Sequence, residues 1–94
     1  MHARVVTGHY HPDKENELDQ VAKESSSTRK SLPGFKHFIG LVDPQTKEFL
    51  TIMLWETEQH AQDTHSEHQK TMASIKHHLT GDEKTKLYEV RYFE

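Results

Sequence analysis

The chain has 94 residues, a length that suits one small domain with a single hydrophobic core. Only 32% of the residues are hydrophobic, but the net charge is just -3 and the apolar positions recur periodically, which argues against disorder. This mildly acidic balance predicts no nucleic-acid partner, and no apolar run approaches the roughly 20 residues of a membrane span. With no cysteine, disulfides and thiolate chemistry are excluded, and we expect a cytoplasmic protein.

The first part of the chain predicts a strand, a helix and a second strand. Residues 3–10 alternate in the manner of a strand, and Asp13 is the expected N-cap of a helix over residues 14–31. The second half of this helix is rich in serine and threonine, so its end is poorly specified. A turn follows, and residues 35–42 form the next predicted strand.

The remainder predicts a hairpin, a helix and a last strand. Residues 48–55 are dense in apolar and β-branched side chains and form the third predicted strand. Thr57 is the expected cap of a helix that runs to Leu79, with a break near Lys70 as an option. Residues 86–93 form the fourth predicted strand.

This order, β-α-β-β-α-β, predicts a ferredoxin-like α+β fold in which two helices cover one face of an antiparallel four-stranded sheet. The third strand is apolar on both of its sides, because Leu50, Ile52 and Leu54 alternate with other apolar residues. The helices can cover only one face of the sheet. We therefore expect a homodimer in which a second copy covers the other face.

Two histidines stand out in the second predicted helix. Its apolar seam steps by three and four residues through Ala61, His65, His68, Met72, Ile75 and Leu79. A neutral imidazole on a buried stripe needs hydrogen-bond partners, and one that faces a pocket can act as a general base near neutral pH. This pattern predicts that His65 and His68 face the interior.

Two short motifs resemble the antibiotic biosynthesis monooxygenase family of dimeric α/β barrels. One is Pro33-Gly34-Phe35, and the other runs from Trp55 to Ala61 with His65 ten residues after the tryptophan. The resemblance implies a homodimer whose two sheets form a barrel, with a small-molecule pocket between each sheet and its helices. Some family members oxidise aromatic polyketides with molecular oxygen and neither metal nor flavin, so no cofactor is expected.

The resemblance also shows departures from the better-defined chemistries of the family. The quinone-forming members carry an Asn and a Tyr where this chain has Thr51 and Ala61. The haem-degrading branch uses a strand-one Asn and a helix-two Trp, and this chain has neither. The resemblance therefore implies the fold more strongly than it implies a particular reaction.

The predicted function is a cofactor-independent oxygenase-like enzyme that acts on a small planar organic molecule. His65 is the candidate base, and the candidate substrate contacts are Trp55, Thr51, His68 and Arg91. For Arg91, pairing with a surface acid is the preferred interpretation. The alternatives are a non-catalytic ligand-binding or stress-related barrel, and a haem-binding or haem-degrading relative.

Nine histidines also raise the question of a metal site. His9 and His11 share one side of an extended chain, and with His37 and His65 they could bind a divalent metal. Their spacing lacks the pattern of known helical sites, so we expect surface histidines and no metal.

Overall fold

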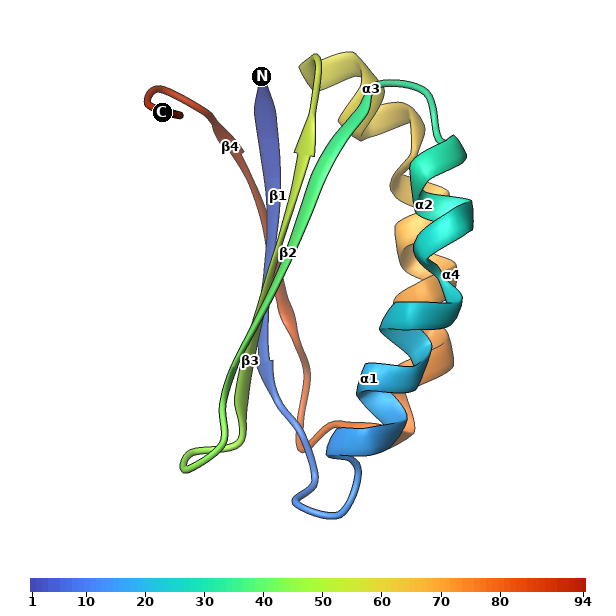
Figure 1. The fold of residues 1–94 in the computed structure, drawn as a ribbon, viewed down its shortest axis with the longest axis vertical. Coiled ribbons are helices and arrows are strands. Elements are labelled where there is room, and N and C mark those ends of the chain that lie inside the picture. The colour runs from blue at the N-terminus through green and yellow to red at the C-terminus, as the bar shows by residue number, and fades with distance from the viewer.

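The computed structural model describes residues 1–94 as one antiparallel sheet with helices on a single face (Figure 1). The four strands are β1 (His2–His9), β2 (Phe35–Asp43), β3 (Glu48–Trp55) and β4 (Lys84–Glu89), and they lie in the order β2-β3-β1-β4. All three strand pairs are antiparallel. The predicted ferredoxin-like α+β fold is therefore confirmed for the single chain.

Each of the two predicted helices is broken in two. The first consists of α1 (Glu15–Glu24) and α2 (Ser26–Ser31), which we call the α1–α2 arm. The second consists of α3 (Glu58–Asp63) and α4 (His65–Ile75) with one 3-10 turn after them, and we call it the α3–α4 arm. None of these helices combines the length and the apolar character needed to cross a membrane.

The two predicted helix caps had different outcomes. Thr57 caps α3 as expected, because its hydroxyl accepts a hydrogen bond from the His60 amide at 3.1 Å. The prediction of an Asp13 cap was wrong: Lys14 occupies the N-cap of α1 and no side chain caps this helix. The turn before α1 is instead closed by the backbone, where the Lys14 amide donates to the His11 carbonyl at 2.9 Å.

The break in the α3–α4 arm lies at Thr64 rather than near Lys70. The Thr64 hydroxyl donates to the carbonyls of His60 at 2.9 Å and Ala61 at 3.2 Å. A threonine that satisfies its hydroxyl on the preceding turn can be buried at little cost, whereas an imidazole would need new partners. The buried seam consequently passes through Thr64, and the prediction that His65 faces the interior was wrong, because His65 is exposed.

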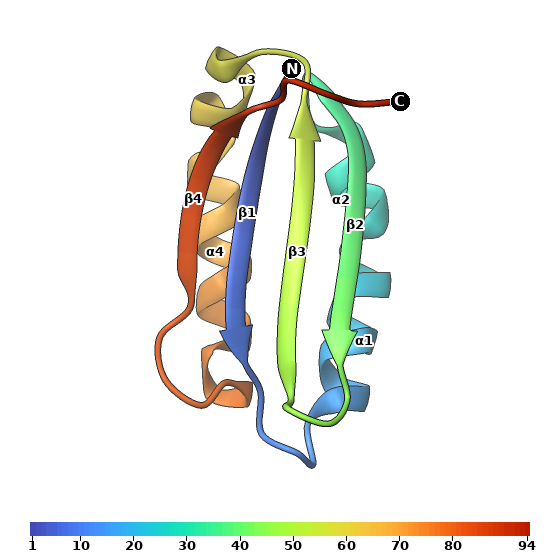
Figure 2. The same cartoon turned by 90° about the vertical axis from the view of Figure 1, so that its left-hand side faces the viewer.

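The last strand begins and ends earlier than predicted. β4 pairs with β1, and this pairing ends where His2 meets Glu89. Beyond that pair the Val90 amide makes one more hydrogen bond, to the Met1 carbonyl at 2.9 Å, and residues 90–94 form a tail instead of a strand. Figure 2 shows this tail crossing the helix-free face of the sheet towards β2, where the rings of Phe93 and His37 lie 5.6 Å apart.

A cluster of buried hydrophobic side chains lies at one end of the sheet, which we call the closed end. Its buried members are Val6, Tyr10, Phe49 and Leu79, packed against Leu18 and Met72. The one hydroxyl in this cluster, that of Tyr10, lies 2.5 Å from Oε1 of Glu15. The closed end therefore anchors both arms to the sheet with its polar group satisfied.

Candidate functional site

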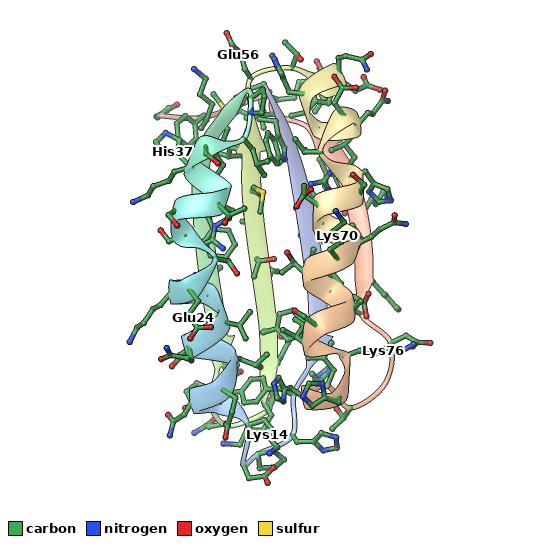
Figure 3. The ribbon with its side chains drawn as sticks, turned by 90° about the vertical axis from the view of Figure 1, so that its right-hand side faces the viewer. Lys14, Glu24, His37, Glu56, Lys70 and Lys76 are labelled. Carbon is green, nitrogen blue, oxygen red and sulfur yellow. The ribbon has the colours of Figure 1, made fainter.

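A cleft of about 680 Å³ lies over β1 and β3, between the two helical arms. Figure 3 shows the two arms on either side of the central strands, seen from the helix side. Thr51 and Met53 form part of the floor, and Arg4 and Trp55 line the cleft at the end opposite the closed end. The α1–α2 wall includes Val21, Ala22 and Leu32, and the α3–α4 wall includes Thr64, His68 and Ile75.

The two sequence motifs meet at this far end of the cleft, which we call the Trp55 end. Gly34 has a φ of 79°, a left-handed conformation that favours glycine, and an added Cβ would collide with the His60 ring. The Gly34 carbonyl accepts a hydrogen bond from the Glu56 amide at 2.8 Å. The turn before β2 and the junction between β3 and α3 thus hold each other in place.

Trp55 is completely buried at this junction. Its exposed fraction is 0%, and Phe35 contacts it edge-on with ring centroids 6.1 Å apart. The indole Nε1–H has no hydrogen-bond partner in the protein. Trp55 is therefore a core residue that also lines the cleft, with one unused donor.

Arg4 lies beside Trp55 and is the most unusual residue of the cleft. Its side chain is only 5% exposed, and its guanidinium carbon is 5.7 Å from the centre of the Trp55 ring. Nη2 donates to the Ala61 carbonyl, while Nη1 is buried without a partner. Burial lowers the pKa of Arg4, but an arginine remains charged at neutral pH. The cleft thus contains a buried cation that forms no salt bridge.

His68 is half-buried and lines the cleft, with Nε2 3.4 Å from the Thr85 hydroxyl on β4. Burial is the main cause that lowers its pKa to about 4, and the positive charges of Arg4 and His65 act in the same direction. His68 is therefore neutral at neutral pH. In that state one ring nitrogen is free to accept a proton or a hydrogen bond.

The other predicted site residues lie away from the cleft. His65 is exposed, and its ring lies 5.9 Å from that of His68 on the outside of the arm. Arg91 is exposed in the C-terminal tail and pairs with Glu89 at 3.5 Å, as the preferred interpretation held. Of the predicted contacts, the structure places Trp55, Thr51 and His68 around one cavity and leaves His65 and Arg91 outside it.

The histidines considered for a metal site do not come together. His9, His11 and His37 are all exposed, and no group of three or more histidine or carboxylate side chains has the arrangement that a metal ion needs.

Sequence reasoning missed Arg4. A signal was present in the sequence, because Arg4 alternates in phase with the apolar Val6. The structure pairs Arg4 with Met53, and Arg4 therefore lies on the helix-covered face of the sheet. A charged residue at such a position is rare unless it has a partner or a function. The alternation alone could have marked it as a candidate.

The sequence matches no family model and no curated protein. Solved structures, in contrast, match over nearly the whole chain at low identity. A candidate antibiotic biosynthesis monooxygenase from Nitrosomonas europaea is 17% identical, with 98% of this chain and 100% of that chain covered and a TM-score of 0.81. One from Deinococcus radiodurans is 15% identical, with 100% and 96% covered and a TM-score of 0.82.

A third similar structure is that of a mutant form of SnoaB, a cofactor-independent oxygenase from Streptomyces nogalater. It is 14% identical, covers 98% of this chain and 94% of its own, and has a TM-score of 0.79. Identities this low establish a shared backbone arrangement, not a shared reaction. The chain therefore has the fold of the antibiotic biosynthesis monooxygenases.

Proposed function

We propose that this protein is a cofactor-independent oxygenase-like enzyme that acts on a small planar organic molecule held in the cleft. The observation that carries the proposal is the position of His68, which lines an apolar cleft that ends at the buried Trp55. The cleft volume of about 680 Å³ suits a molecule of a few fused rings. The likeness to SnoaB, a cofactor-independent oxygenase, supports the same reaction class.

The reaction that fits these residues begins with proton removal. A neutral imidazole nitrogen of His68 takes a proton from an activated C–H bond of the substrate and leaves an electron-rich carbanion. The carbanion passes one electron to molecular oxygen, and the resulting radical pair combines to form the C–O bond of a peroxide anion. The proton held by His68 then returns to this anion and gives a hydroperoxide. Loss of water from the hydroperoxide gives a ketone or quinone, so one substrate molecule and one O₂ yield one oxidised product and one water.

His68 replaces His65 as the proposed base because of where the two side chains lie. His68 lines the cleft, whereas His65 is exposed outside it. A base must reach the proton that it abstracts, directly or through one water. Trp55 and Thr51 remain proposed substrate contacts.

The test is oxygen uptake by chelator-treated protein with anthrone, a planar carbon acid whose oxidation product is anthraquinone. We expect uptake by the wild type, near-complete loss in His68→Gln, and wild-type rates in the matched variant His65→Gln. Wild-type uptake in His68→Gln would overturn the assignment of the base. Binding of anthrone without oxygen uptake would favour a non-catalytic ligand-binding protein. A Soret band that appears on haem titration and is lost in His68→Gln would favour a haem-binding relative.

The proposal includes a homodimer that closes the helix-free face. This face exposes large apolar side chains on both outer strands, including Ile39 (39% exposed), Leu41 (50%) and Tyr88 (47%). Helices cover only the opposite face (Figure 1), and a second copy would bury these side chains. We expect a dimer mass in light scattering and a monomer for Leu41→Lys. A monomeric wild type would contradict the shared barrel.

A further inference from the structure

We propose that the cleft recognises its ligand by an anionic oxygen, a carboxylate or an ionised phenol or enol, which Arg4 and the Trp55 indole N–H bind together. The proposal shares its location with the proposed function but needs no oxygen chemistry. It follows from three observations: Arg4 is a buried charge without a counter-charge, two buried N–H donors have no partner, and the acids that line the cleft do not pair with Arg4.

The first observation is the charge of Arg4. At 5% exposure the guanidinium has given up most of its water, and its one protein partner is the neutral carbonyl of Ala61. A buried charge without a counter-charge is costly, so buried arginines are normally paired with an anion. The stacking on Trp55 at 5.7 Å offsets only a small part of this cost.

The second observation is the chemistry of the unused groups. Arg4 Nη1 and Trp55 Nε1 are both buried, both without a partner in the protein, and both on residues that line the cleft. Guanidinium and indole nitrogens only donate hydrogen bonds. The group that satisfies them must be an acceptor, and the positive charge of one donor selects an acceptor with negative charge.

The third observation is that none of the acids that line the cleft pairs with Arg4. Glu67 lines the cleft, but its carboxylate pairs with Lys70 at 3.5 Å on the surface of α4. Glu24, on the opposite arm, accepts a hydrogen bond from Gln20 at 2.8 Å. The third acid of the lining, Asp19 on α1, forms no ion pair with Arg4 either. The counter-charge is therefore left for a ligand to supply.

The cleft also contains a second arginine that serves as a matched control. Arg29 lies 3.8 Å above the Phe38 ring, and its Nη2 donates to the Ala22 carbonyl at 3.0 Å. It is partly exposed, and none of its nitrogens is among the buried unpartnered atoms. Arg29 therefore tests whether any arginine in the cleft suffices or whether the position of Arg4 matters.

The experiment is calorimetric titration with 4-nitrobenzoate and its neutral isostere 4-nitrobenzamide near pH 7.5. We expect the wild type to prefer the carboxylate by about tenfold or more, the usual size of a charge-assisted hydrogen bond. Arg4→Met should abolish the preference by weakening carboxylate binding by about tenfold or more, and an unchanged circular dichroism spectrum of the variant would show that the fold is intact. Trp55→Phe, which retains a ring but loses the donor, should weaken carboxylate binding several-fold, and Arg29→Met should retain the preference.

The two sources of anionic oxygen are separated with 4-nitrophenol, titrated above and below its own pKa. Tighter binding of the ionised phenol than of 4-nitrobenzoate assigns the site to phenolates or enolates, and the reverse order assigns it to carboxylates. Three results would each overturn the proposal. The wild type could bind 4-nitrobenzoate and 4-nitrobenzamide equally well, the preference could survive in Arg4→Met, or neither anion could bind. Loss of anthrone oxidation with anion binding intact would reject only the proposed reaction.

Discussion

The closed end and the Trp55 end of this small sheet are built on opposite principles. At the closed end, apolar side chains pack together and the single hydroxyl, that of Tyr10, is hydrogen-bonded to Glu15. The one unpartnered buried atom there, Nδ1 of His78 next to Leu79, belongs to a side chain that is only half-buried. At the Trp55 end, Arg4 and Trp55 are buried as deeply as the apolar cluster but keep donors without partners. Unsatisfied buried polar groups cost stability and are retained where they serve a ligand. The difference indicates that one end stabilises the fold and the other end is kept for binding.

The strongest way to test this division is to remove a core side chain at the closed end. Phe49→Ala should lower the free energy of unfolding by about 3–5 kcal/mol, because it deletes a buried ring from the cluster against which both arms pack. Urea denaturation monitored by circular dichroism measures the loss. Met53→Ala, in the half-buried cleft floor, should cost clearly less; an equal cost would mean that the cleft floor is packed as tightly as the closed end.

The next effect concerns the turn that supports the Trp55 end. Gly34→Ala should cost about 2–4 kcal/mol, because alanine disfavours the left-handed φ of 79° and its Cβ would collide with His60. Gly81→Ala is the control, since Gly81 has a φ of 95° but no atom within 4 Å of an added Cβ. We expect about 1–2 kcal/mol there, from the backbone alone. Equal losses in thermal melts would exclude the His60 contact as a constraint.

A smaller effect should follow from acidification. The folded-state pKa of His68 is about 4, below the 6.5 of an unperturbed histidine, so between these values the unfolded chain binds a proton that the folded chain does not. Stability should therefore be fully present above about pH 6.5 and fall as the pH is lowered towards 4.

The contribution of His68 is isolated by comparison with His68→Leu. Burial also lowers the pKa of His78, so the variant should show a shallower pH dependence rather than none. Unfolding curves at pH 7, 5.5 and 4.5 measure the difference between the two proteins. Identical pH dependence would show that His68 is not shielded from solvent in the folded state.

The smallest effect on stability is expected for Arg4→Met, despite the burial of Arg4. Removal of an uncompensated buried charge offsets the lost hydrogen bond to Ala61, so the free energy of unfolding should stay within about 1 kcal/mol of wild type or rise. Addition of 4-nitrobenzoate should raise the melting temperature of the wild type but not of the variant. A large destabilisation would instead identify Arg4 as a structural residue with its charge satisfied.

Much of the backbone could be predicted from local sequence. Residues 48–55 form β3 with the predicted bounds, because an apolar, β-branched run between turn signals has few alternatives. The Thr57 cap was also predictable from its position before a helical pattern. The early end of β4 was not, because it depends on where the neighbouring strand β1 begins.

The site was predictable only in part. Trp55 was located by its position at a strand-to-helix junction, and the same seam that identified His68 placed His65 wrongly. Spacings of three and four residues from Ala61 allow either Thr64 or His65 on the buried face. Side-chain chemistry decided between them, since Thr64 could bond its hydroxyl to the preceding turn.

The sequence by itself determined the order of strands and helices, the face that each strand residue occupies and the junction at Trp55. These features depend on short-range periodicity and on turn residues. Only the tertiary structure decided which polar side chains share the cleft, because Arg4, Trp55 and His68 belong to three different elements whose packing brings them together. Whether a buried donor has a partner is likewise a property of that packing. For this protein, local sequence specifies the scaffold, and long-range contacts specify the chemistry that it can offer.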